Sequence, residues 1–292
     1  MAAVTARGST TVRQALGDAR RELAASPLLE HYPGQERIDA ADLLDHVLGR
    51  TPAPSETLAP RYVERFEALV RRRAAGEPVA MIRGWEEYRG LRITIRPGVF
   101  VPRDSTTFLA EQAIRRLRPR RDPVAIDVAT GSGIVALAMA NEVPKARVFG
   151  TDISAEAVRA ARSNARRLRL GARFAVADGL GGVPPALEGS VDVITLHPPY
   201  VPSAELTELA PEMLLFEPRH THTDGSEDGL GLVRSTVERS RTWLKPGGWL
   251  CIEVSPDVTR ALATAMRRGG LGHVAVTTDS RSAGTRVVVG RR

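Results

Sequence analysis

The hydrophobic pattern of the chain changes its period near residue 80. Before that point apolar residues recur every three or four positions, as they do on the buried face of a helix. Three stripes follow this spacing: Val12, Leu16, Ala19 and Leu23; then Ile38, Ala41, Leu44 and Leu48; then Tyr62, Phe66 and Leu69. Thr10 or Thr11 can cap the first helix with its hydroxyl. We therefore predict a small N-terminal helical domain over residues 1–80.

The next segment alternates instead. Leu91, Ile93 and Ile95 are separated by polar residues, which is typical of a strand with one buried face. The turn sequence "RPG" follows. We expect residues 81–102 to form a hairpin linker between two domains.

Strands and helices then follow one another over residues 103–292. The expected strands are Val124–Val128, Arg147–Thr151, Arg173–Val176, Val191–Leu196, Trp249–Val254, Val274–Thr277 and Arg286–Val289. Helical patterns separate several of them, which favours an α/β domain with a largely parallel sheet.

Composition narrows the class of protein. The chain has 292 residues, 42% hydrophobic, with a formal charge of +7 carried mostly by arginine. This charge is compatible with a nucleic-acid partner, but arginines that solvate helix faces in a chain of biased composition explain it more simply. Aromatic residues, which stack on single-stranded bases, make up only 4%. Binding of nucleic acid is therefore possible but not favoured.

No apolar run reaches the roughly 18 to 20 residues of a membrane span, and the N-terminus has no apolar signal core. We expect a cytoplasmic protein with no membrane partner. The single cysteine excludes an intramolecular disulfide and a cysteine-rich metal site. Cys251 lies in the apolar run "GWLCIEV", which predicts a buried, inert thiol.

A nucleotide-like site is predicted where "VAIDVATGSGIVALAMA" passes from a strand through a glycine-rich turn into a helix. Gly131 and Gly133 allow a ligand to approach the backbone closely, and the helix beginning near Ile134 directs amide groups at the same space. Asp152 ends the second strand, where a carboxylate can accept both ribose hydroxyls. Asp178 ends the third and could accept from an adenine amino group.

Two cofactors suit these residues. Gly131, Gly133 and Ala136 fit the dinucleotide fingerprint, which is weak evidence alone. S-adenosylmethionine fits better, because Asp127 precedes the turn where the cationic amino group of the methionine would lie. The sequence His197-Pro198-Pro199-Tyr200 then follows the fourth strand, where a transferable methyl group would point. Prolines cannot pair in a sheet, so these four residues predict a stiff loop at a strand end.

These motifs together resemble the HemK/PrmC-type protein-glutamine methyltransferases. The similar blocks are "GWEEYRGLRITIRPGVFVPR", "DVATGSGIVALAMA", "FGTDIS", "FEP", "EDGL", "LKPGG" and "AGTRVVVGRR". The resemblance implies a seven-stranded Rossmann-like class I methyltransferase sheet with S-adenosylmethionine as cofactor. It implies cofactor contacts from Asp127, Thr130, Gly131, Gly133, Asp152, Ile153, Asp178, Gly179 and His197, and catalytic roles for His197, Pro198 and Tyr200.

The resemblance fails at one decisive position. The family has Asn-Pro-Pro-Tyr where this chain has His197. An asparagine oxygen and a proline carbonyl can hold an amide NH2 group in line with the methyl group. A neutral histidine offers one donor and one acceptor and can also remove a proton. His197 either replaces the asparagine oxygen as an acceptor or serves a nucleophile with a more acidic proton.

Other departures lie nearby. Where the family has a segment similar to "PRPETE", this chain has "PRDSTT", and the changed positions are Asp104, Ser105 and Thr107. Its first loop glycine is Ala129, which we expect to be tolerated because the two later glycines remain. His220 and His222 could join His197, but histidines in a polar loop are usually surface residues, so we expect no metal site.

The methyl acceptor therefore stays open at this point. One hypothesis is a glutamine amide in a protein, most plausibly a translation release factor by family analogy. The other is a nitrogen or oxygen atom of a small molecule from a specialised pathway. A silent binding protein, a nucleic-acid methyltransferase and a nicotinamide oxidoreductase are less favoured.

Overall fold

The computed structural model describes residues 9–31, 33–103, 105–279 and 286–292. The chain forms two compact units: Met1–Gly84 together with Glu208–Glu217, and Trp85–Thr207 together with Pro218–Arg292. Asp104, one of the changed positions, lies outside the described residues, as do residues 283–285 of the C-terminal motif.

Helices build the first unit: α1 (Val12–Ala24), α2 (Gln35–Leu48), α3 (Pro60–Ala74), the short α4 (Val79–Arg83) and α8 (Pro211–Phe216). Thr11 caps α1, and a capping box with Gln14 completes the start of the helix. A minimal ladder of β1 (Thr10–Thr11) and β2 (Thr57–Leu58) pairs beside this cap. The prediction of an N-terminal helical domain is confirmed.

Two of the three predicted apolar stripes are right at Leu44 and Phe66 and are otherwise displaced by one position from the buried face. Helix α2 buries Ala40, Leu43, Leu44 and Val47, while Ile38 is 55% exposed. Helix α3 buries Val63, Phe66 and Val70, and leaves Tyr62 and Leu69 only partly buried. The buried faces of α2 and α3 pack against each other as well as against α1.

Arg73 explains why the buried face of α3 extends into the basic run "VRRRAAG". Its guanidinium is 4% exposed and contacts Asp39 Oδ2 at 2.5 Å and Glu212 Oε2 at 2.6 Å. Glu212 belongs to α8, which follows the His-Pro-Pro-Tyr loop in the chain but is part of the helical unit. The general expectation that the arginines are solvated is therefore wrong at Arg73.

The second unit begins with the hairpin of β3 (Trp85–Tyr88) and β4 (Leu91–Thr94). Arg89 and Gly90 form its turn, both with positive φ, which matches the twist of a tight hairpin. Leu91, Ile93 and Ile95 are buried as the alternation predicted.

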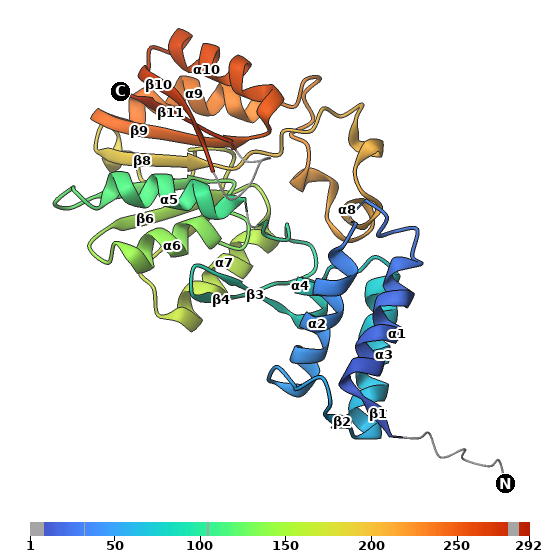
Figure 1. The fold of residues 1–292 in the computed structure, drawn as a ribbon. Coiled ribbons are helices and arrows are strands. Elements are labelled where there is room, and N and C mark those ends of the chain that lie inside the picture. The colour runs from blue at the N-terminus through green and yellow to red at the C-terminus, as the bar shows by residue number, and fades with distance from the viewer. Residues whose placement is uncertain (1–8, 32, 104, 280–285) are drawn as a thin grey trace. The chain divides into compact units, whose positions relative to one another are not determined.

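A seven-stranded sheet forms the body of this unit (Figure 1). Its order is β10-β11-β9-β8-β5-β6-β7. The strands are β5 (Val124–Val128), β6 (Arg147–Asp152), β7 (Arg173–Val176), β8 (Val191–Leu196), β9 (Leu244–Val254), β10 (Gly272–Thr278) and β11 (Arg286–Arg291). Strand β11 runs antiparallel to both of its neighbours, β10 and β9, and all other neighbouring strands of this sheet are parallel. All seven predicted strands are confirmed, as is the seven-stranded Rossmann-like fold class.

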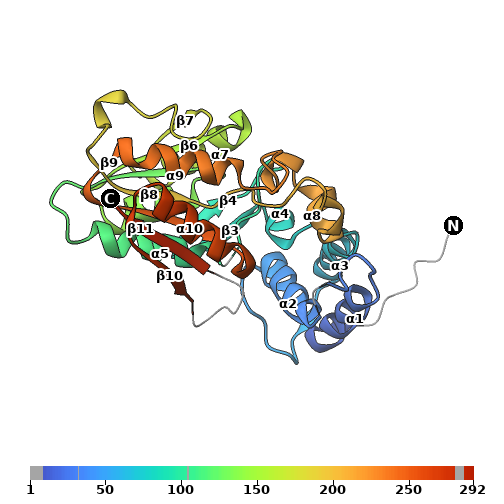
Figure 2. The same ribbon diagram turned by 90° about the horizontal axis from the view of Figure 1, so that it is seen from above.

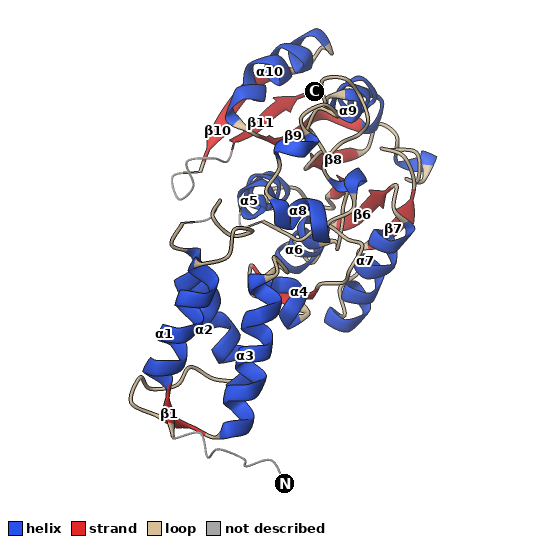
Figure 3. Cartoon of the chain, turned by 90° about the vertical axis from the view of Figure 1, so that its right-hand side faces the viewer, coloured by secondary structure: helices blue, strands red, loops and turns tan. Residues whose placement is uncertain are grey.

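Helices cover both faces of the sheet. The longer ones are α5 (Thr106–Leu117), α6 (Ile134–Glu142), α7 (Ala155–Leu168), α9 (Gly231–Trp243) and α10 (Thr259–Arg268), and single 3-10 turns occupy Pro185–Leu187, Leu206–Glu208, Arg219–Thr221 and Pro256–Val258. Figure 3 shows α9 and α10 on one side of the sheet and α5 and α6 on the other, and Figure 2 shows α9 and α10 in front of the strands. Within the described residues, every helix is too short or too polar to cross a bilayer. The central strands are buried on both faces, so their carboxyl ends are the positions open to a ligand.

Candidate active site

The glycine-rich turn joins β5 to α6 as predicted. Gly131 and Gly133 both have positive φ, at 56° and 87°, and Gly133 directly precedes the first turn of α6. A Cβ added at Gly133 would lie 3.1 Å from the Ala161 Cβ, whereas a Cβ added at Gly131 would meet no atom within 4 Å. Gly133 therefore serves packing, and Gly131 borders open space in which a ligand can approach the backbone.

Asp152 at the end of β6 is held against this turn. Its Oδ2 accepts the amide of Gly131 at 2.8 Å, and its Oδ1 accepts the amide of Ser154 at 2.9 Å. Burial raises the pKa of the Asp152 carboxyl, while these two amides and His220 oppose the rise. Ile153, the next residue, is 67% exposed, which is unusual for a large apolar side chain. A carboxylate beside an exposed apolar surface suits a ribose and an adenine ring.

Asp127 is placed deeper than the sequence suggested. Its side chain is 2% exposed and accepts the hydroxyl of Thr130 at 2.6 Å and that of Thr195 at 2.7 Å. Burial raises the pKa of Asp127 to about 6, although both hydroxyl groups oppose the rise. The carboxyl thus joins the ends of β5 and β8 through Thr195, two residues before His197. A contact with the amino group of methionine stays a prediction.

Asp178 and Gly179 follow β7 at the same edge. Asp178 is exposed, and Gly179 has a positive φ of 55°. The amide of Ala177, directly before them, donates to the carbonyl of Asp152 at 2.9 Å. Hydrogen bonds therefore connect the end of β7 to that of β6, the end of β6 to the turn after β5, and the end of β5 to that of β8.

The His-Pro-Pro-Tyr loop is fixed by a second segment, residues 222–224. Tyr200 and Thr223 form an antiparallel bridge, and the amide of Val201 donates to the carbonyl of His222 at 2.8 Å. The amide of Asp224 donates a hydrogen bond to the carbonyl of Pro199 at 3.2 Å. The carbonyl of Pro198 has no hydrogen-bond partner in the described part of the chain. It is thus available to accept from a substrate.

His197 lies beside Tyr200, which the sequence predicted, and beside three residues that it did not predict: Thr106, Glu253 and Phe100. Its Nδ1 lies 3.1 Å from Thr106 Oγ1 and 3.8 Å from Glu253 Oε2. The Phe100 ring meets it edge-on, with centroids 5.6 Å apart, and the Tyr200 ring stacks at 6.3 Å with a 27° angle. The register of β8 with β9 pairs Leu196 with Ile252, which brings the next residues, His197 and Glu253, side by side. Strand order alone could have indicated Glu253.

The two other candidate histidines differ from each other. His222 is 5% exposed and packs edge-on against Phe100, the same ring that contacts His197. His220 is exposed. The expectation of two surface histidines is wrong for His222, because the bridge to Tyr200 draws its segment inward. Among the described residues, no group of three or more His, Cys, Asp or Glu side chains could hold a metal ion.

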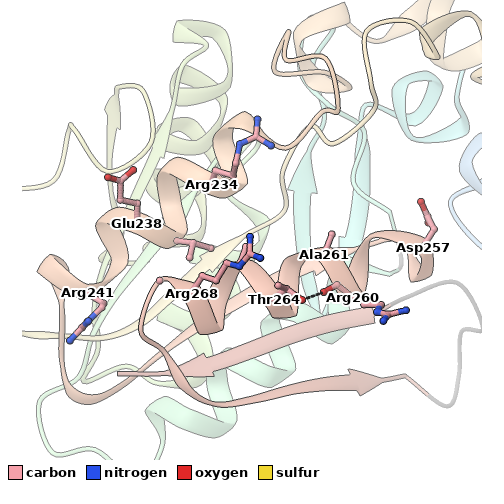
Figure 4. A pocket seen from close by; sticks show the side chains of 11 residues that line it. Arg234, Glu238, Arg241, Asp257, Arg260, Ala261, Thr264 and Arg268 are labelled. Atoms are coloured by element: carbon pink, nitrogen blue, oxygen red, sulfur yellow. Dashed lines mark hydrogen bonds between the residues drawn. The ribbon is translucent and has the colours of Figure 1, made fainter.

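Two further features lie outside this arrangement. Cys251 is fully buried, and burial raises its pKa to about 11, which confirms the prediction of an inert thiol. A surface pocket of about 1030 Å³ lies between α9 and α10 and is lined in part by Arg234, Arg241, Arg260 and Arg268 (Figure 4). It contains none of the predicted site residues, and its arginines project in different directions rather than toward one point.

Comparison with known sequences gives two matches to protein families. A "PrmC N-terminal domain" matches residues 14–84, and a "Methyltransferase domain" matches residues 125–215. A release factor glutamine methyltransferase of Moorella thermoacetica is 36% identical over 266 residues, 89% of this chain and 91% of its own length. A protein of the same name from Burkholderia pseudomallei is 35% identical over 93% of this chain and 95% of its own.

One similar protein has another name. A 4-amino-L-phenylalanine/4-methylamino-L-phenylalanine methyltransferase of Streptomyces pristinaespiralis is 36% identical over 249 residues, 83% of this chain and 82% of its own length. Its name describes a small-molecule amine as the acceptor.

Solved structures share the fold. A T. thermophilus 16S rRNA methyltransferase in complex with AdoMet and guanosine matches with a TM-score of 0.53 and 18% identity, over 71% of this chain and 49% of that one. A methyltransferase from Pyrococcus furiosus matches with a TM-score of 0.51 and 20% identity, over 77% and 96%.

Proposed function

We propose, on the premise that this chain belongs to the family of the release factor glutamine methyltransferases, that it methylates the side-chain amide nitrogen of a glutamine in a release factor. The chain is an S-adenosylmethionine-dependent methyltransferase. What is proposed is the acceptor and the residues that handle it. The single observation that carries the proposal is the unpartnered carbonyl of Pro198, one residue beyond His197. The cytoplasm, where such an acceptor is made, stays a prediction.

The residues at the strand ends fit the cofactor. When bound, S-adenosylmethionine supplies a methyl group on a positively charged sulfur, which is already a competent donor. We propose that Asp152 holds the ribose hydroxyls, that Ile153, Asp178 and Gly179 border the adenine, and that Thr130, Gly131 and Gly133 shape the backbone under the nucleoside. Asp127 would face the amino group of the methionine, and His197 would border the methyl end.

The His-Pro-Pro-Tyr loop would position the acceptor. An amide nitrogen is a weak nucleophile because its lone pair is shared with the carbonyl. Two acceptors, the Pro198 carbonyl and an imidazole nitrogen of His197, can bind the two hydrogens of an NH2 group and fix its orientation. The ring of Tyr200 would form one wall. Such positioning is the main contribution that a methyltransferase adds to a reactive donor.

The test is a transfer assay with labelled S-adenosylmethionine and a purified release factor. Peptide mass spectrometry should find the added mass of one CH2 group on a single glutamine, and changing that glutamine to asparagine should abolish the label. His197→Ala should lower turnover far more than cofactor affinity, and Asp152→Ala the reverse. Absence of transfer to the release factor, with intact cofactor binding, would remove this acceptor.

A second candidate acceptor is a small-molecule amine. It is favoured by His197, which can take a proton as an asparagine cannot, and by the similarity to the Streptomyces pristinaespiralis enzyme. The same assay with aromatic amines in place of the release factor separates the two candidates. Nucleic acid is the least supported acceptor, and an arm with ribosomal RNA provides that control.

A further inference from the structure

We infer that Glu253 is a positioning residue that orients the imidazole of His197, so that its Nε2 accepts the proton released from the methylated nitrogen. This inference rests on the proposed function, because it requires that the nitrogen atom to be methylated binds beside His197. It adds a role for Glu253 and Thr106, and it applies to an amide or an amine acceptor alike.

Glu253 is a buried carboxylate that the fold does not use elsewhere. Its side chain is 5% exposed, and its Oε2 has no hydrogen-bond partner in the described part of the chain. The nearest cation-forming group is His197, whose Nδ1 lies 3.8 Å from that oxygen. A buried carboxylate oxygen without a donor is costly to the fold. This oxygen faces the imidazole of His197, which points to a role in the reaction.

The carboxylate selects one form of the imidazole. A carboxylate only accepts hydrogen bonds, so it repels a lone pair on Nδ1 and attracts a hydrogen there. The Thr106 hydroxyl, 3.1 Å from Nδ1, can accept that hydrogen. With Nδ1 protonated, the lone pair of the neutral ring lies on Nε2. Nε2 has no partner among the described residues, so it is free to meet a substrate.

The surroundings hold the ring without neutralising Glu253. Phe100 and Tyr200 contact the imidazole as described above. The Tyr88 hydroxyl, on β3, donates to the carbonyl of Thr106 at 2.6 Å. Burial and, to a smaller extent, the nearby Glu253 carboxyl raise the pKa of Tyr88 well above its usual range. Burial, followed by Glu253 and Asp257, also raises the Tyr200 pKa, while Arg103 opposes that rise. Both phenols are therefore neutral, so neither places a second negative charge beside the imidazole.

The proton and electron balance is then simple. The lone pair of the acceptor nitrogen forms a bond to the methyl carbon, and the electrons of the carbon–sulfur bond return to sulfur. The nitrogen gains a positive charge and transfers a proton to Nε2 of His197. Glu253 stabilises the imidazolium, which passes the proton to water. An asparagine at position 197 could hold the nitrogen but could not accept its proton.

The first test is Glu253→Gln, which keeps the shape and removes the charge. We expect kcat to fall about 10-fold or more, because a general base typically contributes 10²–10⁴-fold and would be only partly impaired. KM and the cofactor Kd should change by less than about twofold. The acidic limb of the kcat–pH profile should move to lower pH, because the imidazolium loses its stabilising charge. The matched control is Glu142→Gln, which changes a partly buried glutamate at the end of α6 that pairs with Arg89 of the hairpin turn, and it should leave the profile unchanged.

A double variant separates positioning from general structural support. In a His197→Asn background, Glu253→Gln should have no further effect on kcat, since its action passes through the imidazole. If Glu253→Gln lowers kcat equally in both backgrounds, or leaves the pH profile in place, the inference is wrong.

A measurement without substrate keeps this inference distinct from the proposed acceptor. Nitrogen-15 NMR of the imidazole, assigned by its loss in His197→Asn, should show the hydrogen on Nδ1 in the neutral parent and a loss of that preference in Glu253→Gln. A neutral ring protonated on Nε2 in the parent would overturn the inference. If the parent methylates no acceptor tested, the proposed function fails while this tautomer measurement still decides the role of Glu253.

Discussion

Gly229 lies directly against the backbone of Tyr200. A Cβ added at Gly229 would overlap the Tyr200 carbonyl oxygen and lie 2.7 Å from its carbonyl carbon. Gly229 also has a positive φ of 69°. The "EDGL" motif and the His-Pro-Pro-Tyr loop are therefore in backbone contact, and a side chain at residue 229 would displace the loop that we expect to hold the substrate.

Gly229→Ala should accordingly impair turnover more than folding. The positive φ costs roughly 1–2 kcal/mol of unfolding free energy for a residue other than glycine. The displaced loop should reduce kcat about 100-fold, since misplacement of about 1 Å can have that effect. Gly225→Ala is the control, because Gly225 has a φ of 84° but open space around an added Cβ. It should lose only the roughly 1–2 kcal/mol of the positive φ and keep its activity, whereas Gly229→Ala also carries the overlap with Tyr200. Equal activity in both variants would refute the positioning role of Gly229.

Gly131→Ala tests the cofactor contact at the turn. An added Cβ would meet no protein atom within 4 Å, so the loss of unfolding free energy should be limited to roughly 1–2 kcal/mol from the backbone strain. The methyl group would, however, occupy the space into which we place the cofactor, and calorimetry should show an affinity at least about 10-fold weaker. Gly90→Ala, in the hairpin turn with a φ of 73° and similar open space, should cost similar stability at unchanged cofactor affinity. Normal cofactor affinity in Gly131→Ala would remove this assignment.

The sequence predicted the sheet well because its strands are short apolar runs bounded by turn residues. Four of the seven strands differ from the prediction only in that they extend further, as β9 does through Leu244–Gly248. Ala129, where the resembled family has glycine, has a φ of 54°, a conformation that favours glycine, so its tolerance of alanine stays a prediction. Two of the helical stripes were displaced by one position because the face that meets a neighbouring helix depends on the position of that helix, which periodicity does not report.

The candidate site was predicted only where a residue belongs to a contiguous motif. Thr106 and Glu253 were missed because each lies in a segment of different character: one in a changed block, the other inside a buried strand. Their proximity to His197 arises from the order β8-β9 and from the packing of α5 against both strands. Likewise, Arg73 appears in a basic run that looks exposed, and only the fold brings Glu212 to it.

Arg73→Met should destabilise the helical unit strongly. It leaves the buried carboxylates of Asp39 and Glu212 without a cation, and loss of one partner from a buried ion pair costs about 3–5 kcal/mol of unfolding free energy. Replacing all three residues with apolar ones (Asp39→Leu, Arg73→Met, Glu212→Met) should recover most of that loss, because no charge then remains buried.

The neighbouring arginine provides the control. Arg72 forms a partly exposed pair with Glu77, so Arg72→Met should cost no more than about 1 kcal/mol. Denaturant unfolding of the full chain measures all of these variants. If Arg73→Met costs no more than Arg72→Met, the buried triad does not anchor α8.

The buried carboxyl of Asp127 should make stability depend on pH. Burial raises its pKa from 3.8 to about 6, so between these values the folded state binds a proton that the unfolded state releases. Its contribution to stability is therefore fully present below about pH 4 and is lost as pH rises through about 6. The difference amounts to roughly 2–3 kcal/mol at neutral pH. Relative to the parent, Asp127→Asn should thus gain unfolding free energy between about pH 4 and pH 7, measured in denaturant at each pH.

The same carboxyl should link cofactor binding to pH. If the amino group of the methionine lies beside Asp127, its positive charge favours the ionised carboxyl, and binding releases a proton where the free protein still holds one. The affinity of the parent for S-adenosylmethionine should therefore rise as pH increases through about 6 and then level off. Asp127→Asn should bind more weakly and show little change over the same range. A parent affinity that is independent of pH, together with an unaffected variant, would place the methionine amino group away from Asp127 and confine this residue to holding Thr130 and Thr195 in place.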